Sequence, residues 1–261
     1  MFQDYFKGIY RYRHILSSLI KRELQMKYRR SKLGVAWSIV TPLGLAIIVG
    51  FVYSLLFSAD PKAFIPMLFA GLNPWLFMSG TADGATGAFL SAEGYIKQST
   101  VSAQIFPVRV TLVNLVNLLY SIVAFFAIYL FLKPEKFSPE MLGFIPGLLI
   151  MTIFALGIAN ITSVINLSIR DYQPLQSLLI QGLFYATPII FPAEVLKEKG
   201  FAMVYQLNPF YYMLEIVRRP MLGDGFPSWK IYLVAAIIAI LIFALGIIVI
   251  MRAKKTLAYK L

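Results

Sequence analysis

Few side chains in this sequence could carry out acid–base or metal chemistry. The chain contains no cysteine and one histidine, His14, so a thiolate site and a histidine-based metal site are both excluded. No glycine-rich phosphate loop occurs, and no two carboxylates share an apolar segment at a catalytic spacing. Asp83 is the one acid within an apolar segment, and its place near the segment's end favours helix packing over a buried proton site. The sequence therefore predicts no enzymatic activity and no metal or cofactor bound by this chain.

The groups that the sequence supplies in excess are cations and aromatic rings. There are 24 Lys and Arg against 12 Asp and Glu, a net charge of +12, together with 15 Tyr, 21 Phe and 3 Trp. Such a charge could bind nucleic acid, but most of these cations flank apolar runs. There they orient a membrane protein and attract anionic lipid headgroups. We therefore expect membrane lipids, and no nucleic acid, as the partner of this charge.

The segment that carries much of this charge is residues 22–57. Residues 8–30 repeat apolar side chains at helical spacing, which is typical of an amphipathic helix in the headgroup plane. From residue 33 the sequence is apolar for 25 residues, enough to cross a hydrocarbon core of ~30 Å. Basic residues before a first span keep that side of the protein in the cytoplasm. Here they are Lys21, Arg22, Lys27, Arg29, Arg30 and Lys32.

The composition of the whole chain, with 59% hydrophobic residues and a mean hydropathy of +0.74, indicates an all-α integral membrane protein. We predict a cytoplasmic N-terminal region, residues 1–32, a membrane domain, residues 33–251, and a cytoplasmic tail, residues 252–261. Six spans are expected, at 33–57, 64–91, 106–132, 142–168, 175–191 and 231–251. Both ends of the chain then lie inside the cell.

Three further segments have expected roles in this arrangement. Residues 192–227 are too polar and too interrupted to span, so they are expected to form short helices at the outer interface or re-entering it. The polar residues 93–104 are expected in the cytoplasm, as a short helix below the membrane. Asn114 and Asn117, on one face of the third span, more often bond a neighbouring helix than a substrate.

Three sequence stretches carry a resemblance to a known family. They are LQMKYRRSKLGVAWSIVTPL at residues 24–43, IRDYQPL at 169–175 followed by FYATPIIFP at 184–192, and YQLNPFYYMLEIVR at 205–218. In this order they resemble the membrane subunit of bacterial type-2 ATP-binding-cassette (ABC) exporters of polysaccharides, over nearly the whole chain. The resemblance implies a multi-pass protein of the bacterial cytoplasmic (inner) membrane. It would export a lipid-linked O-antigen, capsule or teichoic-acid chain.

The resemblance also implies partners for this chain. The permease would be a homodimer joined to two copies of a cytoplasmic ABC ATPase, which would bind the ATP and Mg that this chain does not. An alternative is a type-2 ABC exporter of a lipid, drug or small glycoconjugate. An unrelated channel is the other alternative, and it would need no ATPase to carry ions.

Site residues follow from the same resemblance. Contact with the ATPase is expected of Arg22, Glu23, Lys27, Arg29, Glu93, Tyr95, Lys97, Arg170 and Asp171. An outer gate is expected to include Pro192, Tyr205, Asn208, Pro209, Tyr211 and Arg218. Aromatic rings that could line the conduit are Trp37, Tyr53, Phe57, Trp75, Phe77, Phe184 and Tyr185. Sugars stack their flat C–H faces on rings without a fixed register, so a polymer can slide along them. Most such rings in a membrane protein nevertheless face lipid or pack in the core, and we expect two or three to face the conduit.

Overall fold

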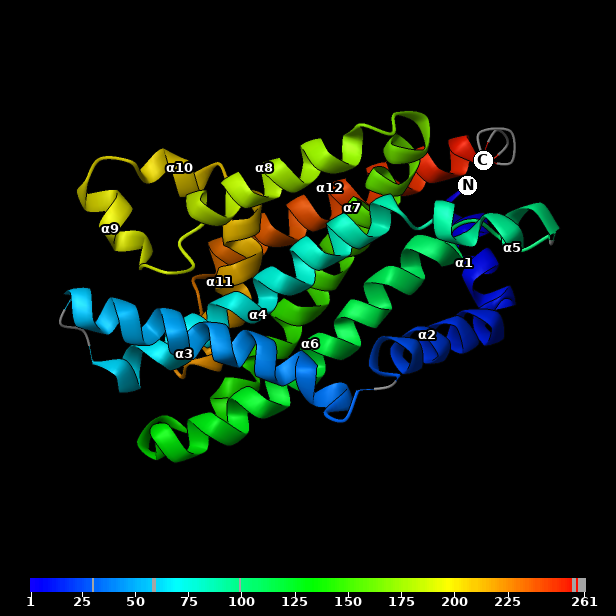
Figure 1. Ribbon diagram of the computed structural model, residues 1–261. Helices are drawn as coiled ribbons and strands as arrows, with labels where there is room; N and C mark the ends of the chain where they lie inside the picture. Colours follow the sequence, from blue (N-terminus) through cyan, green and yellow to red (C-terminus); the bar gives the residue numbers. More distant parts are fainter. Residues whose placement is uncertain (30, 58–59, 99, 255–256, 258–261) are drawn as a thin grey trace.

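The computed structural model describes residues 1–29, 31–57, 60–98, 100–254 and 257, and these residues form helices joined by short connections (Figure 1). Five of the helices are long and apolar enough to cross a membrane. In the described part of the chain these are α3 (Trp37–Phe57), α4 (Pro61–Thr86), α6 (Ile105–Leu132), α7 (Phe144–Ser168) and α12 (Trp229–Ala253). They correspond to five of the six predicted spans, which confirms the all-helical membrane fold.

The fifth predicted span, residues 175–191, forms a shorter helix than expected. Helix α8 (Tyr172–Ala186) has 15 residues, about 22 Å at 1.5 Å per residue. It ends at Thr187, whose backbone is extended, because proline at position 188 disfavours the helical conformation of the residue before it. Helix α8 alone is therefore shorter than a hydrocarbon core of ~30 Å.

Helices α4 and α7 form the centre of the bundle and contact most other helices. Helix α7 packs most extensively against α12, where Gly157 and Gly246 face each other. A Cβ atom added to Gly157 would lie 2.6 Å from the backbone nitrogen of Phe243. At Gly147 an added Cβ would meet the carbonyl oxygen of Ile216 in α11. Small residues thus let the backbones of α7, α11 and α12 approach closely, as membrane helices do.

The N-terminal region differs from the single interfacial helix that residues 8–30 predict. It breaks at Tyr12 into α1 (Phe2–Arg11) and α2 (Arg13–Tyr28). Helix α1 docks into the bundle through Tyr5, which is 1% exposed and accepts a hydrogen bond of 3.0 Å from Asn160 Nδ2. Burial raises the pKa of this phenol to about 12, so it stays neutral. Helix α2 packs along α6. The prediction of one continuous helix over residues 8–30 is therefore wrong, because the chain breaks at Tyr12 and α1 is tied to α7 through Tyr5.

The described residues between α8 and α12 form three short helices. These are α9 (Ala193–Glu198), α10 (Ala202–Gln206) and α11 (Pro209–Met221). Helix α11 is largely buried and packs against α4, α7 and α12. Residues 192–227 therefore form short helices as predicted, and α11 is part of the core.

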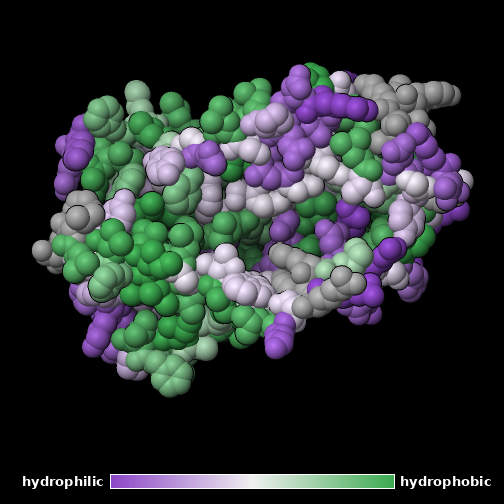
Figure 2. All heavy atoms as spheres, in the orientation of Figure 1, coloured by the Kyte–Doolittle hydropathy of each residue, from purple (hydrophilic) through white to green (hydrophobic). Residues whose placement is uncertain are grey.

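The two ends of the bundle differ in what they carry. The described chain termini, helix α5 (Glu93–Gln98) and the turn between α7 and α8 lie together at one end, on the right in Figure 1. We call it the basic end. The last turn of α3, the first turn of α4 and helix α9 lie at the other end, which we call the opposite end (Figure 1). Figure 2 shows hydrophilic residues gathered at the basic end, a smaller group at the opposite end and mostly apolar side chains between them. This is the distribution expected of a protein with an apolar belt in lipid.

Candidate functional site

At the basic end, helices α2, α5 and α6 bring several predicted coupling residues together. Glu23 Oε2 lies 3.0 Å from Arg109 Nε and joins α2 to α6. Arg22 Nη1 donates a 3.3 Å hydrogen bond to the hydroxyl of Tyr95 and joins α2 to α5. On α5, Lys97 pairs with Glu93 at 2.6 Å on the exposed surface. These contacts make one polar surface from three helices that are distant in sequence.

A groove of about 810 Å³ lies against this surface, lined by Arg22, Glu23, Tyr95 and Arg109 together with Gly80 and Gly84 of α4. At the two glycines α4 presents only its backbone to the groove. Arg109 was not predicted as a site residue; the signal that could have suggested it is a lone charged residue near the start of an otherwise apolar predicted span.

Three other predicted coupling residues, Arg29, Arg170 and Asp171, are not among the residues that line that groove. Arg170 and Asp171 are exposed in the α7–α8 turn, which lies at the same end of the bundle as α5 (Figure 1). Arg29 is exposed just after α2. The side chain of Lys27 lies outside the described residues, and so does Arg30.

One asparagine fixes the α7–α8 turn. Asn166 Nδ2 donates 2.9 Å to the carbonyl oxygen of Thr86, at the end of α4, and Asn166 Oδ1 accepts 3.1 Å from the backbone nitrogen of Gln173 in α8. The Thr86 carbonyl lies at the end of α4 and the Gln173 N–H at the start of α8, and groups at helix ends lack a hydrogen-bond partner within their own helix. Asp83 makes a second contact between α4 and α8, because its Oδ1 accepts from Gln176 Nε2 and Ser177 Oγ. This supports the packing role predicted for Asp83.

At the opposite end, two of the predicted gate residues, Asn208 and Arg218, bond the non-helical residues that follow α8 to helix α11. Asn208 Oδ1 caps α11 by accepting from the backbone nitrogen of Phe210 at 2.9 Å, and Asn208 Nδ2 donates 2.7 Å to Thr187 Oγ1. Arg218 Nη1 donates 2.7 Å to the carbonyl oxygen of Pro188. Arg218 also pairs with Glu215, and both side chains are buried.

The other gate residues lie around this bend. Tyr205 is buried, and its ring contacts that of Tyr211 with centroids 4.8 Å apart. Burial and the nearby Glu215 carboxylate raise the pKa of the Tyr211 phenol. Pro192 precedes α9 and Pro209 begins α11. Of the six residues, Asn208 and Arg218 bond the bend at residues 187–192 directly, and Pro192 is its last residue.

The seven predicted conduit rings fall into different environments. Trp75 and Phe77 are buried, and Trp75 packs against Phe184, with ring centroids 5.7 Å apart. Tyr53 stacks on Phe64. Trp37 is 47% exposed and Tyr185 73% exposed. The side chain of Phe57 lies outside the described residues. Trp37 and Tyr185 are therefore the predicted rings whose faces are most available to another molecule.

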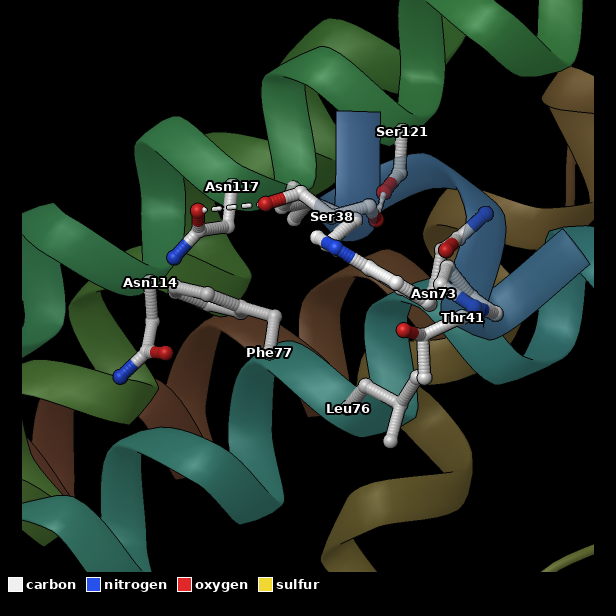
Figure 3. Close-up of a pocket in the computed structure, with 11 residues that line it drawn as sticks. Ser38, Thr41, Asn73, Leu76, Phe77, Asn114, Asn117 and Ser121 are labelled. Carbon is white, nitrogen blue, oxygen red and sulfur yellow. Dashed lines mark hydrogen bonds between the residues drawn. The ribbon is translucent and has the colours of Figure 1, made fainter. Parts of the chain in front are cut away.

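A hollow of about 350 Å³ lies between α3, α4 and α6, within the apolar belt (Figure 3). Polar side chains from all three helices face it, among them Ser38 and Thr41, Asn73, and Asn114 and Asn117. Ser38 Oγ donates 3.0 Å to Asn117 Oδ1, and Ser121 Oγ donates 2.8 Å to the carbonyl oxygen of Ser38. The helix-to-helix bonding predicted for Asn117 thus occurs, whereas Asn114 bonds its own helix at Val110.

Known proteins resemble this chain over most of its length. Residues 15–222 match the family described as ABC-2 type transporter. An O-antigen export system permease protein, RfbA, of Klebsiella pneumoniae is 26% identical over 245 residues, 94% of this chain and 93% of the relative. A protein with the same name from Myxococcus xanthus is 29% identical over 213 residues, 80% of each chain. The polysialic acid transport protein KpsM of Escherichia coli is 22% identical over 214 residues, 78% of this chain and 79% of the relative. The chain belongs to the ABC-2 type transporter family.

Proposed function

We propose that this chain is the membrane-spanning subunit of an ATP-driven exporter that moves a lipid-linked polysaccharide across the bacterial cytoplasmic membrane. The observation that carries the proposal is the match to an O-antigen export permease over 94% of this chain and 93% of the relative. The hydrophobic composition and the five long apolar helices agree with it. O-antigen, capsule and teichoic acid are the candidate polysaccharides.

The proposed assembly is a homodimer with two copies of a separate ATPase, which supply ATP and Mg. The basic end faces the cytoplasm in this proposal, with both chain termini inside, because cytoplasmic segments of membrane proteins are enriched in Lys and Arg. Helix α8 completes the six spans together with the bend at 187–192, which is buried against α11 as non-helical backbone at membrane depth requires.

The ATPase is proposed to act on the surface formed by α2, α5 and the α7–α8 turn. The ion pair between Glu23 and Arg109 connects that surface to α6. Asn166 connects the turn to the end of α4. A displacement of α2 or of the turn is thereby transmitted to two spanning helices through specific bonds. Aromatic rings, Trp37 and Tyr185 foremost, are proposed to contact the polymer.

The proposal is tested by deleting the gene in the native bacterium and restoring it on a plasmid. We expect surface polysaccharide to disappear on deletion, its lipid-linked form to accumulate inside, and an ABC ATPase to copurify with the chain. Unchanged surface polysaccharide would rule the proposal out. Accumulation of another lipid or a drug would favour an exporter of that compound. Ion flux through liposomes containing this chain alone would indicate a channel.

A further inference from the structure

A second cleft at the basic end lies between helix α1, the residues that lead into α6, and the end of α12, which lie close together in Figure 1. We call it the α1 cleft. Lys7 and Arg11 of α1, Thr100 and Ser102 before α6, and Lys254 after α12 line it. Its volume is about 470 Å³, within the range of small-molecule sites, ~300–1,000 Å³.

Hydrogen bonds fix the wall of the α1 cleft. The hydroxyl of Tyr12 donates 2.8 Å to the carbonyl oxygen of Thr100, and Gln104 Nε2 donates 3.2 Å to the carbonyl oxygen of Tyr5. Gly8 lets the backbone of α1 come this close, because an added Cβ atom there would collide with the side chain of Gln104. Helix α1 and residues 100–104 therefore form one fixed surface beside the end of α12.

Three cations face the α1 cleft from helices at the two ends of the sequence. Lys7, Arg11 and Lys254 are exposed, and within the ranges that the structure describes none of them forms an ion pair. Asp4 is the acid in the lining. The amino group of Met1 bonds Asp4 at 3.0 Å and, with the charges of Lys7 and Lys254, lowers the pKa of that carboxyl. The cleft therefore keeps a net positive charge, and an anion inside it would relieve the repulsion between the cations.

The neighbouring face of α1 indicates which kind of anion the cleft receives. Phe2, Phe6 and Tyr10 recur every four residues, so they share one helix face, and they are 44%, 54% and 70% exposed. The Phe6 ring also contacts that of Phe243, with centroids 6.3 Å apart. Phe243 lies ten residues before Ala253 at the end of α12, about 15 Å along that spanning helix. Exposed aromatic rings beside a spanning helix meet acyl chains at the membrane interface.

We propose that the α1 cleft binds the headgroup of an anionic phospholipid, whose phosphate contacts Lys7, Arg11 and Lys254 while its acyl chains lie along Phe2 and Phe6. A soluble phosphate would use the cations but leave the aromatic face without a role. The bound lipid would join α1 to α12, in addition to the bond of α1 to α7. The inference goes beyond the proposed function, since it requires a membrane but no glycan.

The proposal is tested by thermal unfolding of the purified chain in detergent with phosphatidylglycerol. A ligand that binds the folded chain stabilises it, so the unfolding temperature should rise by about 5 °C at ~100 times the dissociation constant. Phosphatidylcholine with the same acyl chains has no net charge and should give at most about 1 °C. An equal rise with phosphatidylcholine would show that the cations are not used, and an equal rise with inorganic phosphate would show a site for a soluble anion. Either result overturns the proposal.

Neutralising the three cations locates the effect. The triple variant Lys7→Gln, Arg11→Gln and Lys254→Gln should lose more than half of the rise given by phosphatidylglycerol. Without lipid it should unfold at the native temperature, because the three side chains are exposed and form no ion pair among the described residues. The matched control is Lys62→Gln, Lys197→Gln and Lys199→Gln, which removes three exposed cations at the opposite end and should keep the full rise. A full rise in the first triple variant would overturn the proposal.

A measurement on the native chain does not depend on how the variants fold. Phosphatidylglycerol with a photoactivatable diazirine in an acyl chain is incorporated into vesicles with the chain, and the crosslinked peptides are identified by mass spectrometry. We expect crosslinks on α1 at residues 2–10, and excess unlabelled phosphatidylglycerol should reduce them at least threefold more than phosphatidylcholine does. Crosslinks on other helices with none on α1 would reject the site.

Discussion

At the scale of single residues, asparagine side chains connect the helices at several points. Asn166 joins α4 to α8, Asn208 joins α11 to the bend after α8, and Asn160 holds Tyr5 of α1. An amide has a donor and an acceptor, so one side chain can satisfy two helix-end groups at once. Such bonds matter most where water is excluded, because an unpaired group there has no other partner.

Asn166→Ala should lower the stability of the chain by about 1–3 kcal/mol, because it leaves the Thr86 carbonyl and the Gln173 N–H without their bonds. Thermal unfolding in detergent measures the change. Ser168→Ala, two positions along the same helix, is the control and should have little effect, since the Ser168 hydroxyl bonds within α7. Equal unfolding temperatures for Asn166→Ala and the native chain would contradict the role given to this residue.

Charge reversal tests the basic surface. The double variant Arg22→Glu and Arg29→Glu should reduce export at least tenfold, since it places repulsive charge where the ATPase is proposed to bind. The amount of chain in the membrane should not change, because both side chains are exposed. Export is read as surface polysaccharide and membrane content by immunoblot. Lys62→Glu, exposed at the opposite end, is the control; undiminished export by the double variant would exclude this surface from coupling.

At the scale of helices, α11 depends on one buried ion pair. Arg218 bonds both Glu215 and the carbonyl oxygen of Pro188, so the pair holds α11 against the non-helical residues after α8. Buried ion pairs add little net stability compared with apolar residues of similar size. Removing one partner is nevertheless strongly destabilising, because the other charge is left buried and unpaired. The pair therefore sets the position of the bend more than it contributes to stability.

A double-mutant cycle distinguishes these contributions. Glu215→Leu or Arg218→Leu alone should destabilise the chain by about 3–5 kcal/mol, because each leaves a buried charge unpaired. The double variant should recover part of that loss. Unfolding temperatures in detergent measure all three variants. If the double variant is as unstable as the sum of the single variants, the two side chains do not act as a pair.

At the scale of the whole molecule, the basic end and the opposite end predict which residues are accessible from each side of the membrane. Single cysteines are informative because the native chain has none. In intact cells with a permeable outer envelope, an impermeant maleimide should label Lys136→Cys and Glu198→Cys but not Arg170→Cys or Lys254→Cys. Lysis should make the latter two reactive. Labelling of Arg170→Cys before lysis would show that the orientation is reversed, and labelling of Lys254→Cys alone would show that α8 does not cross the membrane.

Hydrophobicity predicted the spanning helices well, because residues 106–132 and 142–168 are apolar well beyond the length that a bilayer needs. The apolar pattern alone did not predict where a helix ends or breaks. Pro188 ends α8 early, and Tyr12 lies at the break between α1 and α2, although the apolar repeat continues through it. The groove and hollow were not predicted, since they depend on which faces of α3, α4 and α6 meet. Arg109 is the one charged residue in the third predicted span, but its pairing with Glu23 depends on how α2 packs along α6.

The close approach of three backbones at Gly147, Gly157 and Gly246 has a consequence for how the protein moves. Where backbone touches backbone, no layer of side chains can change rotamer to let one helix slide past another. Helices α7, α11 and α12 should therefore shift together as one block during each transport cycle. Displacements within a single copy should then fall on helices outside this block, among them α3 and α8, whose apolar faces are mostly uncovered.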